Sequence, residues 1–132
     1  MDDNSKPVTN LLYLGLSSEL RTQIQKLLHK GSGFEYFDDL DDAYSHLTSK
    51  NCRTEIVVMS DLNDLAPLAV LLKIKKIQRL VPIIVLSENK KSSLAIEIIK
   101  AGAYDFFLLP VTTRELLDSI NQALIDLRLN SK

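Results

Sequence analysis

The chain alternates short apolar runs with longer segments in which apolar residues recur at helical spacing. The runs at residues 10–16, 34–38, 55–59, 81–87 and 103–110 predict five strands. The central ones are apolar throughout rather than alternating, as expected for strands that are buried on both faces. The segments between and after them predict five helices, at residues 18–30, 39–50, 66–80, 89–102 and 112–129.

The order of these elements predicts an α/β protein. A strand followed by a helix, repeated along the whole chain, is typical of a doubly wound, five-stranded parallel sheet with helices on both faces. At this size the common strand order is 2-1-3-4-5, and a site is then expected at the carboxyl ends of the first and third strands. Gly15-Leu16 and Ser60-Asp61 lie at those ends.

The length supports one domain. The chain has 132 residues, of which 45% are hydrophobic and 25% charged, an ordinary composition for a globular domain. We expect a polar N-terminal tail at residues 1–9, a single domain at residues 10–129, and the start of a linker or C-terminal tail at residues 130–132.

Charge and the reactive residue types exclude several functions. The net charge is −1, so no basic field favours direct binding of nucleic acid. One cysteine permits no internal disulfide, and the two histidines lack the spacing of metal ligands. No apolar run reaches the ~18 residues of a membrane span, and no signal peptide is evident. We therefore expect a cytoplasmic protein with no membrane segment, no metal and no cofactor.

Three stretches resemble the receiver domain of response regulators, the phosphoacceptor module of two-component signalling. "LLYLGLSSELRTQIQKLL" is similar to the family's first strand and helix, and "PIIVLS" to its fourth strand. "GAYDFFLLP" is similar to the family's motif before the fifth helix and is the most specific of the three. The resemblance implies the flavodoxin-like, three-layer receiver fold.

The resemblance also implies which positions carry the family's chemistry. In the family, an acidic pair holds Mg²⁺, an aspartate accepts the phosphoryl group, and a hydroxyl and a lysine complete the site. The acidic pair falls on Gly15 and Leu16, the acceptor on Ser60 counting from Glu55, and the lysine on Leu109; only the hydroxyl is retained, as Ser87. A site without metal ligands and lysine lacks the charges that phosphoryl transfer needs.

Asp61 is an acid one residue beyond the expected acceptor. Because neighbouring side chains of a strand point to opposite faces, this register predicts that its carboxylate is aimed away from Ser87 and Leu109. We therefore expect a degenerate phosphorylation pocket, at Gly15, Leu16, Ser60, Asp61, Ser87 and Leu109, that has no catalytic residue.

Exposed apolar residues on the last two helices predict a partner face. The expected buried stripe of the fourth helix is made by Ala95, Ile98 and Ile99. Ile96 lies off that stripe, and Ile125 and Leu129 lie opposite the buried stripe of the fifth helix. In receiver domains these helices flank the fifth strand and form the dimer or partner face, and Phe106 falls on the family's switch aromatic. We expect a homodimer or protein partner at Ile96, Phe106, Ile125 and Leu129.

The sequence thus predicts a non-enzymatic, phosphorylation-independent receiver-like domain that acts through protein–protein contacts. Such domains commonly form the N-terminal regulatory part of a transcriptional or signalling regulator, so an output domain outside this chain is expected. Two alternatives stay open. One is a small-molecule sensor that uses the remodelled apolar pocket, and the other is a phosphoacceptor that uses Asp61.

Overall fold

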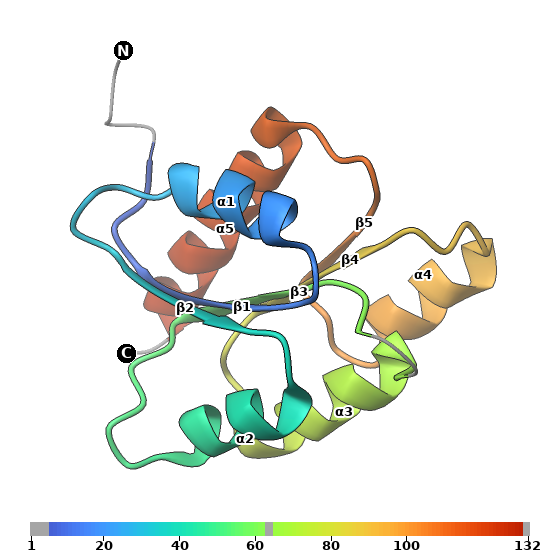
Figure 1. The fold of residues 1–132 in the computed structure, drawn as a ribbon, viewed down its shortest axis with the longest axis horizontal. Helices are drawn as coiled ribbons and strands as arrows, with labels where there is room; N and C mark the ends of the chain where they lie inside the picture. Colours follow the sequence, from blue (N-terminus) through green and yellow to red (C-terminus); the bar gives the residue numbers. More distant parts are fainter. Residues whose placement is uncertain (1–5, 63–64, 131–132) are drawn as a thin grey trace.

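The computed structural model describes residues 6–62 and 65–130, which form one five-stranded sheet with helices on both faces (Figure 1). The strands are β1 (Asn10–Leu14), β2 (Gly33–Phe37), β3 (Ile56–Met59), β4 (Ile83–Ser87) and β5 (Asp105–Leu108). The helices are α1 (Ser18–Lys26), α2 (Leu40–Thr48), α3 (Pro67–Ile77), α4 (Ser92–Lys100) and α5 (Thr113–Asn130). All paired strands run parallel in the order β2-β1-β3-β4-β5, which confirms the predicted fold class.

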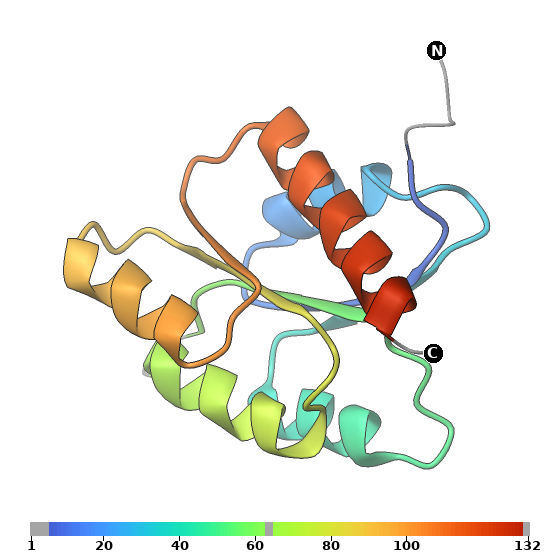
Figure 2. The ribbon, with the colours of Figure 1, turned by 180° about the vertical axis from the view of Figure 1, so that it is seen from behind.

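The sheet separates two helical layers. Helices α1 and α5 cover one face, and α2, α3 and α4 cover the other, as the views from the front and from behind both show (Figures 1 and 2). Each layer has its own apolar core. Tyr13 and Val58 pack toward α1 and α5, whereas Leu14 and Met59 pack toward α2, α3 and α4. The central strands are therefore apolar at every position because both of their faces are buried.

Side-chain caps explain where several helices begin. The Ser17 hydroxyl accepts a hydrogen bond from the Leu20 N–H at 3.0 Å, and an Asp39 carboxylate oxygen accepts one from the Asp42 N–H at 3.0 Å. At the start of α5, Thr112 and Glu115 cap each other's backbone N–H groups. These bonds satisfy N–H groups that the first turn of a helix leaves without a partner.

The domain begins before the residue predicted from the sequence. Thr9 is buried, its hydroxyl donates to Glu55 at 2.9 Å, and the Pro7 carbonyl accepts the His29 N–H. Part of the predicted tail thus packs on the domain. Residues 1–5 and 131–132 of the predicted tails lie outside the described residues.

The predicted burial of one residue of α4 is wrong. Ile99 of α4 is 46% exposed, whereas Ile98 is fully buried. The cause is the position of α4, which packs on α3 and on the edge strand β5 and so buries only a narrow stripe. No helix among the described residues is long and apolar enough to span a membrane.

Neighbouring leucines of α3 test this packing. Leu71 is fully buried and Leu72 is 48% exposed. We expect Leu71→Ala to lower the free energy of unfolding by about 2–5 kcal/mol, because it leaves a cavity in the core. Leu72→Ala is the matched control and should change it by less than about 0.5 kcal/mol. Urea denaturation measures both, and equal losses would contradict the assigned faces of α3.

Candidate functional site

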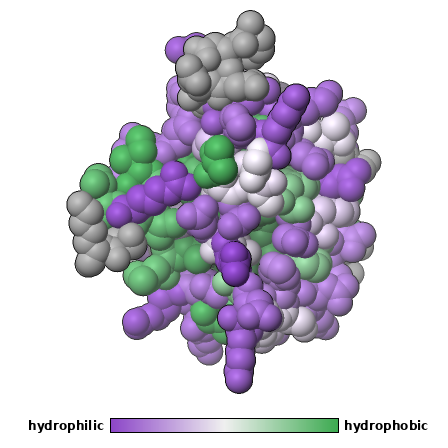
Figure 3. All heavy atoms as spheres, turned by 90° about the vertical axis from the view of Figure 1, so that its left-hand side faces the viewer, coloured by the Kyte–Doolittle hydropathy of each residue, from purple (hydrophilic) through white to green (hydrophobic). Residues whose placement is uncertain are grey.

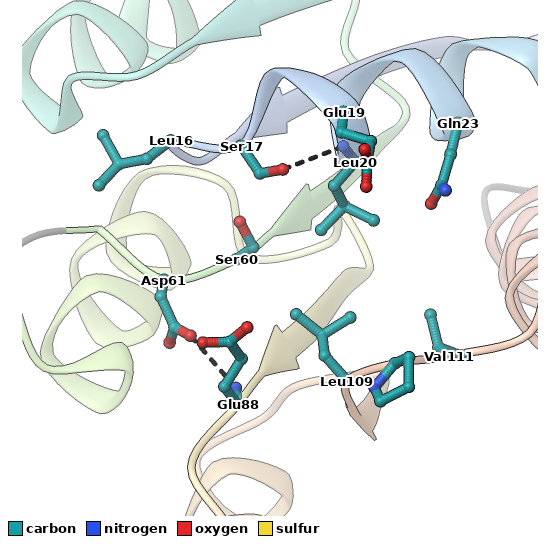
Figure 4. Close-up of a pocket in the computed structure, with 11 residues that line it drawn as sticks. Leu16, Ser17, Glu19, Leu20, Gln23, Ser60, Asp61, Glu88, Leu109 and Val111 are labelled. Carbon is teal, nitrogen blue, oxygen red and sulfur yellow. Dashed lines mark hydrogen bonds between the residues drawn. The ribbon is translucent and has the colours of Figure 1, made fainter.

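Polar and apolar side chains meet at the carboxyl ends of four neighbouring strands. Gly15 follows β1, Ser60 and Asp61 follow β3, Ser87 ends β4, and Leu109 follows β5. Backbone hydrogen bonds hold these ends together: the Ser60 N–H donates to the Leu14 carbonyl at 2.9 Å, and the Leu109 N–H donates to the Ser87 carbonyl at 2.8 Å. The structure therefore brings the predicted site residues to one end of the sheet (Figure 4).

The carboxylate of Asp61 lies beside Ser87, and the predicted orientation is wrong. The Ser87 hydroxyl donates to Asp61 Oδ1 at 3.2 Å, and the Glu88 backbone N–H donates to Asp61 Oδ2 at 3.2 Å. The pairing of β3 with β4 explains this position. Met59 pairs with Val85, so Asp61 and Ser87, each two residues further on, extend from the same face. Asp61, rather than Ser60, thus occupies the place that the resemblance gives to the phosphoacceptor.

Ser60 points to the other face of the sheet. Its hydroxyl and the Tyr13 hydroxyl form a hydrogen bond of 2.8 Å in which either group can be the donor. Both side chains are buried. Burial raises the pKa of the Tyr13 phenol, and the bond to Ser60 lowers it by a smaller amount, so the phenol is neutral at neutral pH.

The Tyr13–Ser60 pair fills the space beside Gly15. A Cβ atom at position 15 would overlap the Ser60 Oγ and would lie 2.6 Å from the Tyr13 Oη. Both contacts are shorter than van der Waals packing allows. A side chain at this position, an acid included, therefore requires that the buried hydroxyl pair move.

Apolar residues surround the rest of the site. A cavity of about 560 Å³ opens between α1, the exits of β3 and β4, and the loop from β5 to α5. Its apolar lining consists of Leu16, Leu20, Leu109, Pro110 and Val111. Leu109 also packs against the core beneath α1 and α5. The position that the resemblance assigns to the lysine is therefore part of an apolar wall.

Two acids that were not predicted to belong to the site also line this cavity. Glu19 reaches it from the first turn of α1, and Glu88 from the residue after β4. The Glu88 backbone N–H donates to Asp61, so the two residues are neighbours at the cavity (Figure 4). The position of Glu88, directly after the strand that ends in Ser87, was the available signal in the sequence. Among the described residues, no group of three or more His, Cys, Asp or Glu side chains could hold a metal ion.

The predicted partner face is exposed at three of its four residues. Ile96 is 57%, Ile125 51% and Leu129 62% exposed. Phe106 is half-buried and packs against the core beneath α2, α3 and α4. Leu108 of the edge strand β5 is also 44% exposed, and neither it nor the exposed Ile99 was predicted to belong to this face.

Solved structures of receiver domains have this fold. No family model and no curated protein matches the sequence. The CheY-like receiver domain protein of Methanospirillum hungatei JF-1 is similar with a TM-score of 0.82 and 18% identity, over 94% of this chain and 99% of that one. The beryllofluoride-activated NtrC4 receiver domain dimer gives a TM-score of 0.79 and 18% identity, over 89% of this chain and 98% of that one. NtrX of Brucella abortus gives 0.80 and 24%, over 92% of this chain but 28% of that longer chain.

These likenesses establish the fold of a response-regulator receiver domain. At such low identities the function must be argued from the site itself. Asp61 and Ser87 supply the carboxylate and the hydroxyl that the resemblance implies. Gly15, Leu16 and Leu109 stand at the positions of the implied metal-binding acids and of the implied lysine.

Replacement of Gly15 tests the crowding at the end of β1. We expect Gly15→Ala to lower the free energy of unfolding by about 1–3 kcal/mol, because the new Cβ displaces the buried hydroxyl pair. Combined with Ser60→Ala, which removes the nearest obstacle, the loss should be smaller than the two single losses added together. Gly31→Ala is the control, since the nearest atom to its Cβ would be 3.8 Å away. If Gly15→Ala were as stable as the parent protein, the assigned contact would be wrong.

Proposed function

We propose that this chain is an atypical receiver domain of two-component type that acts through protein–protein contacts without phosphorylation of Asp61. The observation that carries the proposal is the space beside Gly15, which the Tyr13–Ser60 pair fills. The family holds its metal with acids at this end of β1. In this chain the Tyr13–Ser60 pair occupies the space that such a side chain at position 15 would need.

The remaining side chains do not fit Mg²⁺ as a receiver holds it. Magnesium requires a compact octahedron of oxygen ligands. Gly15 and Leu16 offer no side-chain oxygen, and Asp61 already accepts hydrogen bonds from Ser87 and from the backbone of Glu88. The acids that remain, Glu19 and Glu88, do not form with Asp61 a group suited to a metal ion within the described residues.

The pocket also offers no positive charge to a phosphoryl group. No Lys, Arg or His is among the described residues that line it, whereas three carboxylates are. An aspartyl phosphate here would place an anion beside Glu88 with nothing to neutralise it. Since phosphoryl transfer depends almost wholly on positioning and charge compensation, this environment opposes it.

A phosphoacceptor role for Asp61 is the second candidate, and one observation favours it. The carboxylate lies at the acceptor's place beside the Ser87 hydroxyl, rather than on the opposite face. Position alone supplies only part of what the reaction needs, because the ligands for the metal and the lysine are missing. We therefore rank this role below phosphorylation-independent signalling.

The output surface in this proposal is the edge formed by α4, β5 and α5. It carries Ile96, Ile99, Leu108, Ile125 and Leu129, all large apolar residues that are exposed. Figure 3 shows the side that faces left in Figure 1, on which hydrophilic side chains surround an apolar patch. Exposed apolar residues on α4, β5 and α5 favour a protein contact there. We infer a homodimer through this edge, with an output domain elsewhere in the regulator.

Chemical phosphorylation tests the proposed function directly. We expect incubation with acetyl phosphate and Mg²⁺ to leave the intact mass of the protein unchanged, because the acceptor lacks a metal site and a lysine. Asp61→Asn is the control for modification at other residues. A phosphoryl adduct that forms on the parent protein and is absent from the Asp61→Asn variant would contradict the proposal.

Charged residues on the output surface test its role. We expect the double variant Ile96→Lys/Ile125→Lys to sediment as a monomer at concentrations where the parent protein is a dimer, because buried like charges oppose association. Leu72→Lys is the matched control, since Leu72 is 48% exposed and lies on α3, outside this surface. A double variant with unchanged sedimentation would exclude this edge as the dimer interface.

A further inference from the structure

A second cavity lies at the amino ends of β4 and β5, at the opposite end of the sheet from Asp61. Its volume of about 430 Å³ falls within the ~300–1,000 Å³ typical of small-molecule sites. Four segments build it: the end of α3, the residues before β4, the turn from α4 to β5, and the second half of α5. Its apolar lining consists of Leu80, Val81, Pro82, Ala103, Ala123 and Leu127.

Lys75 contributes the one basic side chain that lines this cavity among the described residues. Its stem lies against the turn from α4 to β5, since a Cβ atom at Gly102 would be 3.2 Å from the Lys75 Cε. Within the described chain its ammonium donates to the Arg79 carbonyl at 3.0 Å and has no carboxylate partner. Burial lowers the pKa of Lys75, as expected for an ammonium that has lost water without gaining an anion. An ammonium has three hydrogens, so two remain for another partner.

The one acid that lines the cavity in the described chain, Asp126, has its partners within the protein. Its Oδ2 accepts a hydrogen bond from the Tyr104 hydroxyl at 2.7 Å, and its Oδ1 accepts one from the Gln122 amide at 3.1 Å. Burial and the bond to Asp126 raise the pKa of Tyr104 to about 12, so the phenol keeps its proton at neutral pH. Lys75 is therefore the charged group of this cavity that remains available to a ligand.

The helix ends beside the cavity add positive charge. Lys76 follows Lys75 in the last turn of α3, and Lys100 lies in the last turn of α4, two residues before Gly102. These cations outnumber the single acid of the lining, so the local field favours an anion over a cation.

Leu80 gives an independent indication that the ligand has an apolar body. It lines the cavity, and at 81% it is the most exposed large apolar side chain of the described residues. Covering such a side chain removes apolar surface from water, which is favourable. A ligand that lies against Leu80 and reaches Lys75 would gain from both groups.

We propose that this cavity binds a small carboxylic acid, a carboxylate on an aryl or short alkyl body. The carboxylate accepts hydrogen bonds from the ammonium of Lys75, and the apolar body lies against Leu80, Ala103 and Leu127. A single ammonium suits a single negative charge, whereas a phosphate group offers three oxygens to several donors. The inference goes beyond the proposed function and does not depend on it, because the two sites lie at opposite ends of the sheet.

The inference is tested by NMR with 3-phenylpropionate as the probe. Saturable shifts in the ¹⁵N–¹H spectrum are expected at Lys75, Leu80, Gly102 and Tyr104, and the affinity should fall as salt is added. 3-Phenylpropionamide, which has the same body without the charge, should bind roughly three- to tenfold more weakly, and 3-phenylpropylammonium should not bind. Absence of saturable shifts at these residues with the acid, or equal binding of the amide, would overturn the proposal.

Replacement of Lys75 tests whether its ammonium holds the carboxylate. Lys75→Met keeps most of the stem and removes the charge, so it should weaken binding of 3-phenylpropionate by roughly three- to tenfold. Binding of the amide should stay unchanged, which shows that the variant keeps an intact cavity. Lys76→Met is the matched control, because Lys76 is an exposed lysine in the same turn of α3 outside the cavity lining. If the two variants bound the acid equally well, Lys75 would not be the binding group and the proposal would fail.

Replacement of Leu80 tests the place of the apolar body. Leu80→Ala should weaken binding of the acid and of the amide by the same factor, because it removes apolar contact and leaves Lys75 in place. Leu72→Ala is the matched control, since Leu72 is an exposed leucine of α3 outside the cavity lining. Unchanged binding in Leu80→Ala would overturn the assigned site. None of these outcomes affects the proposed function, which the acetyl phosphate experiment tests separately.

Discussion

The alternation of side chains at the end of β3 determines the properties of the site. Ser60 and Asp61 are neighbours, so their side chains extend to opposite faces of the sheet. Ser60 bonds to Tyr13 on the side of α1 and α5, and this pair occupies the space into which a side chain at position 15 would extend. Asp61 bonds to Ser87 on the other side. The opposite directions of these two side chains thus keep a carboxylate beside Ser87 and fill the space that a side chain at position 15 would need.

The charge balance of the pocket follows from these replacements. In a receiver, the lysine and the metal neutralise a cluster of acids, and an unpaired cation in a partly buried site would be costly. Here the acids at the end of β1 are absent, and the lysine position is Leu109, which is partly buried and packs against the core. Glu19 and Glu88, on elements outside the expected constellation, nevertheless leave the cavity acidic. The cavity therefore keeps negatively charged side chains, and no basic side chain among the described residues lines it.

The sequence predicted the fold well because the fold depends on patterns of burial. Continuous apolar runs identify strands that are buried on both faces, and the order of strands and helices restricts the topology to a few choices. The site was predicted less completely. Alternation alone says that Ser60 and Asp61 point apart, but the pairing of Met59 with Val85 decides which of them meets Ser87. Glu19 and Glu88 are distant in sequence, and only the folded chain places them in the same cavity. Ile99 was assigned to the core because a helical pattern does not reveal that α4 lies at the edge of the sheet.

The most direct test of the proposed signalling without phosphorylation is a titration with beryllofluoride, a mimic of the phosphoryl group, in the presence of Mg²⁺. We expect that the ¹⁵N–¹H signals of Asp61, Ser87 and Phe106 do not change beyond the changes seen with Mg²⁺ alone. Saturable shifts that begin at Asp61 and extend to Phe106 and α4 would contradict it. Such shifts would show that the pocket accepts a phosphoryl group and transmits its presence to the partner face.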